Sequence, residues 1–421
     1  MTENRIYNVV IVGGGASGLA AAVELKMSSP ELSVLVIEKM AEPARKLRAT
    51  GSGRCNITNT NAAGYNRIME FFAKIGLVIR AYENGLVYPY SESAADVAEL
   101  LISRATSLGV DFSRGEEAVL IEKVSDRFTI KSEFRDKSGA HTVSTEADYV
   151  ILATGGKAGP TYGTTGDGYR FAKAFGHSIV TPVPVLTSVE CREWDKEAFP
   201  RAICLAGTRS AGIVSLFKKD SDGQMKPLFE EMGEIQFTKY GLSGICVFNM
   251  TRHMRYDRAA GESLEDFTIT LNLFPDGRLD EYIKERKIGA FSECRIEEML
   301  STLLKAPIAG YIMSLASAEG VETTGPISSL KDEDIKLISR MVHELAFCPA
   351  GLRGWKDAQA TSGGVSLDEI DDDSSESKLV QGLYITGELA DRDFQCGGFN
   401  LSNAWLTGLA AADSIAANCK P

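Results

Sequence analysis

The glycines near the start of the chain are spaced as in turns that bind the pyrophosphate of a dinucleotide. A strand-like apolar run, residues 9–12, leads into the glycine-rich segment 13–18, and an alanine-rich helical segment follows. Glycine lets the backbone come close to a pyrophosphate, and the start of a helix offers unpaired N–H groups and a positive dipole end. The pattern predicts a phosphate-binding turn made by Gly13, Gly15, Ala16, Ser17 and Gly18.

A second apolar run, residues 34–37, ends in an acid. Glu38 follows Gly18 at the distance where such folds place the carboxylate that accepts hydrogen bonds from an adenosine ribose. A glycine-rich turn alone is a weak signal, but this one has its strand, its helix and its acid. An ordinary structural turn is therefore the less favoured interpretation.

Length and composition limit the remaining possibilities. At 421 residues the chain exceeds the ~250–300 residues of a single core, so two domains are expected. The formal net charge of −12 argues against a broad basic surface for nucleic acid or acidic lipid, although a local basic groove stays open. No apolar run reaches the ~20 residues that span a bilayer, and the glycine-interrupted segment 9–23 is expected to be core and not an export signal.

The cysteines and histidines point away from disulfides and metals. The 8 cysteines show neither a Cys-x-x-Cys spacing nor a dense framework, which favours reduced thiols in a cytoplasmic protein. The histidines at 141, 253 and 343 have no mutual spacing that would build a metal site, so no metal is expected. His177 is expected at the surface or at a helix end.

Apolar periodicity predicts the elements that must position the glycine turn. Residues 94–108 repeat at helical spacing, and strand-like runs between 119 and 145 predict a small antiparallel meander. The chain then returns to the sheet at 149–152, which ends in a second glycine turn. Residues 382–388 predict another strand that ends at a cofactor, and residues 401–417 predict a final helix.

The middle of the chain has a different character. Residues 267–273 alternate apolar and polar side chains, which predicts a half-buried strand, and helical patterns follow between about 280 and 346. We therefore expect residues 186–354 to form an inserted domain for substrate, part β and part α. The nucleotide-binding domain would then be discontinuous, made of residues 1–185 and 355–421.

A longer segment, RKLRATGSGRCNITN at 45–59, is too particular for generic nucleotide binding. With Glu38, it resembles the BaiN-like flavoproteins, bacterial FAD-dependent NAD(P) oxidoreductases that include RdsA-type ribosomal RNA dihydrouridine synthases and aminoacetone oxidase family FAD-binding enzymes. Other segments that resemble the family are GLVYPYS (85–91), FTKYGLSG (237–244), TSGGV (361–365), GELAD (387–391) and CGGFNL (396–401). The resemblance covers nearly the whole chain.

This resemblance implies an α/β fold. The FAD-binding domain would be Rossmann-like with three-layer ββα architecture, and the insertion would be a β-barrel with a small helical domain over the flavin. The sequence departs from the family pattern at Ser93, Lys239, Ile245, Cys246 and Phe399, where Lys, His, Pro, Ala and Tyr are usual. These departures leave the FAD site intact and concern the substrate pocket.

The resemblance also implies the contacts of a bound flavin. Lys39, Arg45 and Lys46 would compensate phosphate charge or shape the ring pocket, and the backbone near Val119 would contact the adenine. Asp391 would reach the ribityl chain or the phosphates. The remaining expected contacts are Ala153, Thr154 and Gly155 in the second glycine turn, Gly387 and Glu388 before Asp391, and the ring loop residues Gly51, Gly53, Arg54, Cys55 and Asn56.

The last helix is expected to begin at the pyrimidine edge of the flavin. Its first residues are Gly397, Gly398, Phe399, Asn400 and Leu401. Their N–H groups and the helix dipole, about half a positive charge, would favour negative charge near N1 and O2 of the reduced ring. This arrangement is one that a flavin reductase needs.

Catalytic roles are predicted only for side chains of the ring loop. Arg54 and Asn56 can supply hydrogen-bond donors, and Cys55 is a hypothetical proton donor to a substrate carbon. A redox disulfide between Cys55 and Cys396 is disfavoured, because flavin disulfide reductases keep their pair close in sequence. The tyrosines at 88, 90, 162 and 240 are general acids or stacking residues in one interpretation and packing residues in the commoner one.

The leading functional hypothesis is an FAD-dependent oxidoreductase that passes hydride from flavin N5 to an electron-poor C=C. No second glycine fingerprint appears, so NAD(P)H would dock transiently as the electron donor. The alternatives are a ribosomal RNA dihydrouridine synthase using the cations Arg45, Lys46, Arg48 and Arg54, a small-amine oxidase producing H2O2, and a non-catalytic FAD sensor. The expected partner is a small molecule or ribosomal RNA and not a membrane. The substrate, the electron donor and the oligomeric state stay open.

Overall fold

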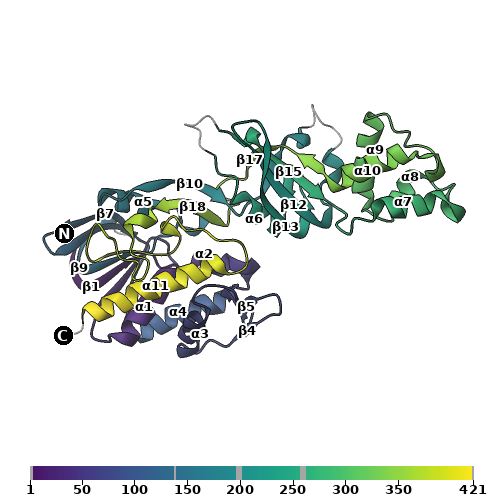
Figure 1. Ribbon diagram of the computed structural model, residues 1–421. Helices are drawn as coiled ribbons and strands as arrows, with labels where there is room; N and C mark the ends of the chain where they lie inside the picture. The colour runs from purple at the N-terminus through teal and green to yellow at the C-terminus, as the bar shows by residue number, and fades with distance from the viewer. Residues whose placement is uncertain (1–2, 137–138, 196–201, 257–261, 420–421) are drawn as a thin grey trace. The chain divides into compact units, whose positions relative to one another are not determined.

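The computed structural model describes residues 3–136, 139–195, 202–256 and 262–419. The chain divides into two compact units, which are coloured along the sequence in Figure 1. The first unit is Met1–Pro184 with Gln359–Pro421, and the second is Val185–Ala358. Among the described residues, no helix is both long enough and apolar enough to cross a membrane.

The first unit is built on a seven-stranded mixed sheet. β1 pairs in parallel with β2 and with β9, and β8 pairs antiparallel with both β7 and β9. The sheet order is β6-β2-β1-β9-β8-β7, with β19 parallel to the end of β9. The strands are β1 (Glu3–Val12), β2 (Val34–Glu38), β6 (Asp111–Arg114), β7 (Glu116–Val124), β8 (Arg127–Asp136), β9 (Gly139–Leu152) and β19 (Leu383–Ile385).

The predicted meander is part of this sheet and not a separate one. β9 is one strand of 14 residues that includes both the stretch around Val143 and the run at 149–152. β1 pairs with it continuously, from Glu3 opposite Val143 to Val12 opposite Leu152. Periodicity alone divided β9 in two, because many side chains in the half that pairs with β8 are exposed, whereas those at its end are buried.

Helices cover the core of the first unit. α1 is buried along most of its length between the sheet and its neighbours α4 and α11, which explains its alanine-rich composition. A Cβ atom on Gly408 of α11 would lie 2.3 Å from the Ser17 carbonyl oxygen of α1, so the two helices pack directly together, as Figure 1 shows. The predicted helices at 94–108 and 401–417 are confirmed. The helices of this unit are α1 (Ala16–Ser28), α2 (Arg45–Ala49), α3 (Tyr65–Lys74), α4 (Ala94–Ser107), α5 (Asp167–Ala174) and α11 (Phe399–Asn418).

Two small sheets complete the first unit. β3 (Thr58–Asn59), β5 (Leu86–Pro89) and β4 (Ile79–Ala81) form a three-stranded antiparallel sheet beside the ring loop. β10 (Ile179–Val185) pairs with β18 (Ala360–Val365), which brings together the two ends of chain that flank the second unit.

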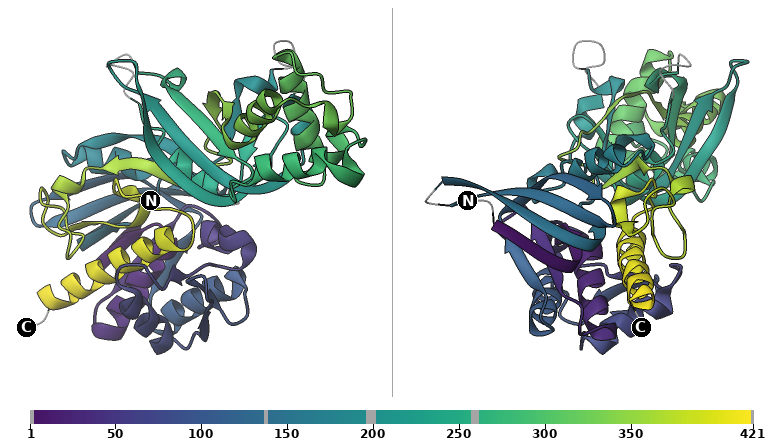
Figure 2. Two further views of the ribbon diagram at one scale, coloured as in Figure 1. Left: turned by 45° about the vertical axis from the view of Figure 1, so that its right-hand side comes forward. Right: turned by 90° about the vertical axis from the view of Figure 1, so that its left-hand side faces the viewer.

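The second unit combines an antiparallel sheet with helices, as Figure 2 shows from two sides. In β15, Phe267, Ile269 and Leu271 are fully buried and alternate with partly exposed residues, which confirms the predicted strand. The sheet order is β16-β15-β12-β13-β14-β11-β17. Its strands are β11 (Val189–Cys191), β12 (Arg209–Lys219), β13 (Met225–Phe237), β14 (Gly241–Ser243), β15 (Phe267–Asn272), β16 (Leu345–Phe347) and β17 (Pro349–Leu352), and its helices are α6 (Ile245–Thr251), α7 (Leu279–Lys287), α8 (Ile296–Leu300), α9 (Ala306–Ala318) and α10 (Asp332–His343).

His177 is buried, so the prediction of a surface position was wrong. Its Nδ1 lies 3.0 Å from Oε2 of Glu369, and its Nε2 lies 2.8 Å from Oγ of Ser377. The left-handed Gly176 that follows α5 turns the chain inward. The imidazole therefore ties the end of α5 to the loop after β18.

Candidate functional site

The three glycines of the predicted phosphate turn have three different surroundings. Gly13 has a φ of +110°, and a Cβ atom there would lie 2.4 Å from the Ala153 carbonyl oxygen. A Cβ atom on Gly18 would lie 2.1 Å from the Gly13 carbonyl oxygen, because α1 packs directly on the turn. At Gly15 the nearest neighbour of an added Cβ would be 4.0 Å away. Packing therefore requires glycine at 13 and 18, whereas the space beside Gly15 is open to a ligand.

The start of α1 is free to bind an anion. Gly15 precedes the helix in an extended conformation, no side chain caps the helix, and its first turn holds no acid. The first N–H groups of a helix have no partner within the helix, and together with the dipole they attract a phosphate. The hydroxyl of Ser17 accepts a hydrogen bond from the Thr386 hydroxyl at 3.2 Å, which positions the side chain at the start of the helix. The turn fits the pyrophosphate of FAD.

Glu38 is fixed at the end of β2 by two backbone N–H groups. Gly14 donates to its Oε2 at 2.9 Å, and Met40 donates to its Oε1 at 2.8 Å. Burial raises the pKa of Glu38, and these two hydrogen bonds offset part of that increase. Each carboxylate oxygen keeps a further lone pair, so the side chain is positioned to accept hydrogen bonds from ribose hydroxyls.

Replacing Glu38 by glutamine should weaken FAD binding about tenfold to a hundredfold, because hydrogen bonds to a charged acceptor contribute about 1.5–3 kcal/mol. The NH2 group of the glutamine would also face the N–H group of either Gly14 or Met40, so two donors would oppose each other. FAD titration of the apoprotein measures the change, and E42Q, at an exposed acid, is the matched control. An affinity equal to wild type would remove Glu38 from the ribose site.

The same variant should alter the pH dependence of stability. The pKa of Glu38 is higher in the folded state than in the unfolded state. Its contribution to stability is therefore fully present at pH values below the unfolded pKa, and it is lost as pH rises through the folded pKa. Glutamine does not titrate. The melting temperature of E38Q apoprotein relative to wild type should therefore rise from about pH 4 to neutral pH. A constant difference across this range would contradict the raised pKa.

A cleft lies beside the phosphate turn. Its lining includes the predicted residues Gly13, Glu38, Lys39 and Thr154, together with Ala118 of β7. Next to Ala118, the pairing of β7 with β8 shifts register, and Val119 is the extra residue of the bulge. A bulged residue leaves the ladder of backbone hydrogen bonds. The backbone of Val119 is thus available to the edge of an adenine.

Two of the cations predicted to compensate phosphate charge or shape the ring pocket, Lys39 and Lys46, also have acidic partners. Lys39 contacts Asp167 and donates to the Thr165 hydroxyl at 2.6 Å. Lys46 lies 2.7 Å from Oε2 of Glu388. These lysines position loops of the cleft, while Arg45 is exposed.

The motif that contains Glu388 and Asp391 is held against β18. Oε1 of Glu388 accepts the Thr361 N–H at 2.8 Å, and the Asp391 carboxylate accepts the Gly363 N–H at 2.9 Å. Gly387 must lack a side chain, because a Cβ atom there would lie 3.0 Å from the Ser17 hydroxyl. The segment therefore closes on the start of α1, where the phosphate turn lies.

The ring loop, residues 50–56, follows an unusual backbone path. Gly51, Ser52, Gly53 and Cys55 all have φ between +57° and +86°. Two of these residues have side chains, and a left-handed conformation is uncommon for them. Strained backbone conformations of this kind persist only where the surrounding structure holds them in place, and they are found most often at ligand-binding sites.

The side chains of the ring loop are not equally accessible. Cys55 is fully buried in the hydrophobic core, and burial raises the pKa of its thiol to about 12. Asn56 is nearly buried, and its Oδ1 accepts the Val87 N–H at 3.3 Å. Arg54 is exposed, with its guanidinium carbon 4.9 Å from the centre of the Tyr88 ring. Of these three side chains, Arg54 is the one that reaches solvent, and the Cys55 thiol belongs to the core below the loop.

The residues that directly follow the ring loop, 57–59, join it to α11. The Thr58 hydroxyl lies 2.7 Å from the Ser402 hydroxyl, Asn59 donates to the Gly397 carbonyl at 3.1 Å, and the Trp405 indole donates to the Ile57 carbonyl at 2.9 Å. Gly398 has a φ of +95°, and a Cβ atom there would lie 2.5 Å from the Thr58 carbonyl oxygen. The two segments that were predicted to contact the flavin ring therefore meet.

The N-terminus of α11 has no side-chain cap and no acid in its first turn. The Asn400 side chain is engaged elsewhere. Its Oδ1 accepts the Phe394 N–H at 3.0 Å, and its Nδ2 donates to the Phe394 carbonyl at 2.7 Å. Asn400 thus fixes the preceding loop, and the backbone N–H groups of α11 are left to a ligand.

Sequence reasoning named Ala153, Thr154 and Gly155 at the start of the segment that joins β9 to α5, but it missed the rest of that segment and the first residue of α5. Gly163 and Asp167 line the cleft, and Asp167 is the partner of Lys39. The available signal was the density of glycines, which stand at 155, 156, 159, 163, 166 and 168. These glycines let the loop cross close to Glu38 and the phosphate turn.

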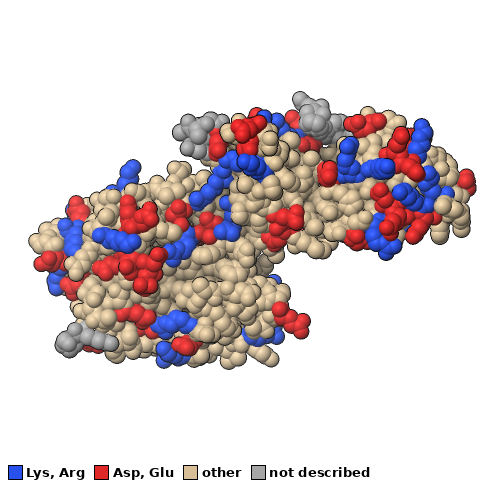
Figure 3. All heavy atoms as spheres, in the orientation of Figure 1, with Lys and Arg blue, Asp and Glu red and all other residues tan. Residues whose placement is uncertain are grey.

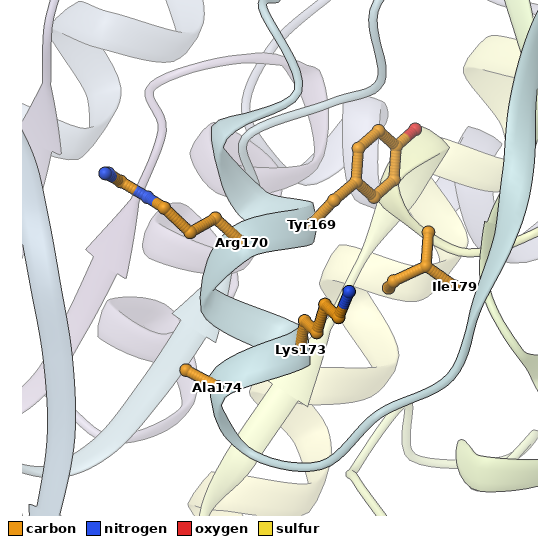
Figure 4. A pocket seen from close by; sticks show the side chains of 5 residues that line it. All are labelled: Tyr169, Arg170, Lys173, Ala174 and Ile179. Atoms are coloured by element: carbon orange, nitrogen blue, oxygen red, sulfur yellow. The ribbon is translucent and has the colours of Figure 1, made fainter.

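Another pocket is lined by Tyr169, Arg170, Lys173, Ala174 and Ile179, and none of these is a predicted site residue (Figure 4). Arg170 points to the opposite side of α5 from Tyr169 and Lys173. The Tyr169 hydroxyl is buried without a hydrogen-bond partner, and its burial raises the pKa of the phenol. The five residues that line this pocket include no glycine, and no cofactor contact is assigned to it.

Comparison with known proteins places the chain in a family. Residues 7–66 and 62–414 match the HI0933-like protein Rossmann domain. A 3-dehydro-bile acid delta(4,6)-reductase of Clostridium scindens is 30% identical, covering 96% of this chain and 98% of its own. A ribosomal RNA dihydrouridine synthase of Haemophilus influenzae is 27% identical, with the same coverage of 96% and 98%. Among solved structures, a 3-ketosteroid-delta4-(5alpha)-dehydrogenase of Rhodococcus jostii covers 98% of this chain and 97% of its own, at 14% identity and a TM-score of 0.47. The chain belongs to the HI0933-like Rossmann family and is a flavin-dependent oxidoreductase.

Proposed function

We propose that this protein is a reductase that uses FAD to pass hydride from NAD(P)H to an electron-poor C=C of an enone- or uracil-like substrate. The observation that carries the proposal is the uncapped start of α11, fastened to the ring loop through Trp405 and Thr58. A helix N-terminus favours negative charge, and the reduced flavin ring carries that charge at its pyrimidine edge. The reductase name of one relative supports the same chemistry.

In this proposal the described residues bind FAD from end to end. The open space beside Gly15 and the start of α1 receive the pyrophosphate, Glu38 accepts the ribose hydroxyls, and the bulged Val119 contacts the adenine. Asp391 and the start of α11 take the ribityl and ring portions. We assign residues 1–185 and 355–421 to this binding domain, and residues 186–354 to substrate selection.

Bound FAD supplies a site, N5, that accepts hydride from one partner and gives it to another. The overall change is NAD(P)H + H⁺ + C=C giving NAD(P)⁺ and the saturated bond, so one proton must come from outside the flavin. Cys55 is excluded from that role in our proposal, because its thiol is buried and its pKa is near 12. The ring loop therefore shapes the ring pocket with its backbone, and its exposed side chains are those of Ser52 and Arg54.

Steady-state turnover tests the proposal. FAD-loaded protein should oxidise NADPH or NADH only when an enone is present, and the product should be two hydrogens heavier by mass spectrometry. C55S should keep nearly all of this activity, because the buried thiol transfers no proton. Nicotinamide consumption without any saturated product, across a panel of enones, would contradict the proposal.

A second candidate is ribosomal RNA dihydrouridine synthesis, which the name of one relative supports. The local basic cluster that would favour it is largely neutralised, because Lys46 pairs with Glu388 and Arg48 pairs with Glu99 at 2.7 Å. On the face shown in Figure 3, basic and acidic side chains likewise lie close together. Mass spectrometry of ribosomal RNA from a strain lacking the gene decides, since an unchanged dihydrouridine content would exclude this activity.

A further inference from the structure

A group of arginine and tyrosine side chains extends from Arg54 of the ring loop, and apart from Arg54 the proposed FAD contacts do not use it. This Arg–Tyr cluster consists of Arg54, Arg80, Tyr82, Tyr88, Tyr90 and Glu92. The guanidinium carbon of Arg80 lies 5.0 Å from the centre of the Tyr82 ring and 5.1 Å from that of Tyr90. One guanidinium therefore orients two aromatic rings at once.

Glu92 holds the cluster together. Its carboxylate contacts Arg80 and the Tyr82 hydroxyl, and it lies 4.0 Å from Arg54. Glu92 has a φ of +48°, an uncommon conformation for a residue with a side chain. The strained backbone conformation thus occurs at Glu92, the residue whose carboxylate joins both arginines.

A chain of contacts runs from the cluster to the ring loop. A Cβ atom on Gly51 would lie 3.5 Å from Cε1 of Tyr88, and Arg54 of the same loop covers the Tyr88 ring. The rings of Tyr88 and Tyr82 meet edge to face, with centroids 5.8 Å apart. The cluster is therefore continuous with the loop that was predicted to contact the flavin ring.

The cluster is both accessible and net positive. Tyr90 is 65% exposed and Tyr82 is 39% exposed. The side chains of Arg54 and Arg80 are 52% and 40% exposed, and a single carboxylate faces the two guanidiniums. Exposed aromatic rings stack on flat heterocycles, and arginine binds phosphate in a bidentate geometry. A ligand that has both a purine and a phosphate matches these groups.

We propose that the Arg–Tyr cluster binds the adenosine 2′-phosphate portion of NADPH, with the adenine on Tyr90 and the 2′-phosphate at Arg80. This inference rests on the proposed function, which requires a nicotinamide donor beside the flavin but identifies no site for it. Because the contacts already fix the rings and guanidiniums, little side-chain entropy is lost on binding. The site selects NADPH over NADH, since only NADPH carries the 2′-phosphate.

The charges around the cluster favour a dinucleotide over a nucleic acid. A polymer gains affinity by neutralising several phosphates along a basic groove. The neighbouring cations Lys46 and Arg48 have acidic partners, and the whole chain carries a formal charge of −12. The two arginines of the cluster suffice for one phosphate group and not for a strand.

Calorimetric titration of the FAD-loaded protein with 2′,5′-ADP tests the site without catalysis. R80A should raise the Kd about tenfold or more, because a charge-assisted bond to the phosphate is lost. Y90L should raise it about tenfold, and Y90F should stay within about twofold because the stacking face remains. R278A is the matched control, since Arg278 also covers a tyrosine, at 4.9 Å from the Tyr282 centroid, and pairs with a glutamate.

The nicotinamide preference gives a second readout. The ratio of NADH Kd to NADPH Kd should fall toward one in R80A and stay at its wild-type value in R278A. Failure of wild type to bind 2′,5′-ADP, or equal binding by wild type, R80A and Y90L, would overturn the site. Loss of oligouridylate binding in these variants, with no effect on 2′,5′-ADP, would overturn it in favour of RNA.

The two proposals fail in distinguishable ways. If neither nicotinamide reduces the flavin but 2′,5′-ADP binding still depends on Arg80 and Tyr90, the binding site stands and the proposed electron donor is wrong. If NADPH reduces the flavin at equal Kd in wild type and R80A, the reductase proposal stands and the site is wrong.

Discussion

Replacing Gly15 by valine should give a folded protein that no longer retains FAD. Gly15 is extended, with φ −83° and ψ −166°, a conformation that β-branched residues readily adopt, and an added Cβ would meet no atom closer than 4.0 Å. The unfolding free energy of the apoprotein should therefore change by less than about 1 kcal/mol. The bulky side chain would occupy the space of the pyrophosphate, and we expect FAD affinity to fall at least about a hundredfold.

The matched variant is G18V, which should fail to fold. There the added Cβ would lie 2.1 Å from the Gly13 carbonyl oxygen, and neither α1 nor the sheet can move away. Visible absorbance of the purified proteins reports FAD, and thermal melting of the apoproteins reports the fold. A G15V protein that keeps wild-type FAD content would show that the pyrophosphate does not lie beside Gly15.

Replacing Trp405 by alanine should lower the unfolding free energy by about 3–5 kcal/mol, the usual cost of removing a large buried aromatic ring. Trp405 is fully buried and meets Phe72 edge to face at 5.2 Å. Its indole also donates to the Ile57 carbonyl, which connects α11 with the end of the ring loop. Flavin binding should weaken as well, because this connection aligns the two ring contacts.

The variant W405F separates packing from the hydrogen bond. It keeps an aromatic ring in the core but leaves the Ile57 carbonyl without its donor, so we expect a smaller loss of about 1–3 kcal/mol. Urea denaturation of the apoproteins measures both variants. Equal losses for phenylalanine and alanine would assign the whole effect to the hydrogen bond, and no loss in either would contradict the core position of α11.

The parts of the site that the sequence predicted are those encoded in local turns. A phosphate turn needs glycines at fixed spacing, and Gly18 meets the backbone carbonyl of nearby Gly13, which excludes any side chain there. Glu38 is fixed by Gly14 and Met40, which lie in the same β-α-β segment. Such constraints act over few residues, so a motif records them.

The missed features depend on distant partners. Lys39 meets Asp167, and Lys46 meets Glu388, across 128 and 342 positions of sequence respectively. From sequence alone both lysines resemble free cations for phosphate. The burial of Cys55 was hidden for the same reason, because the core that encloses it comes from several separate segments.

The accessibility of the tyrosines also depended on tertiary structure. Tyr88 is buried below the ring loop, whereas Tyr90, two residues later, is exposed and covers Arg80. Every second residue of a strand lies on the same face, so Tyr88 and Tyr90 would share a face if the strand continued. β5 ends at Pro89, however, and the alternation does not extend to Tyr90. Sequence reasoning therefore named both tyrosines and could not separate a packing residue from a stacking one.

Anaerobic reduction of the FAD-loaded protein tests the central claim most directly. One equivalent of NADPH should bleach the visible flavin absorbance, and an enone added afterwards in the absence of oxygen should restore it as the saturated product forms. Both half-reactions are needed for a nicotinamide-dependent reductase. A flavin that neither NADPH nor NADH bleaches, or a reduced flavin that oxygen reoxidises but no enone or uridine does, would contradict this account.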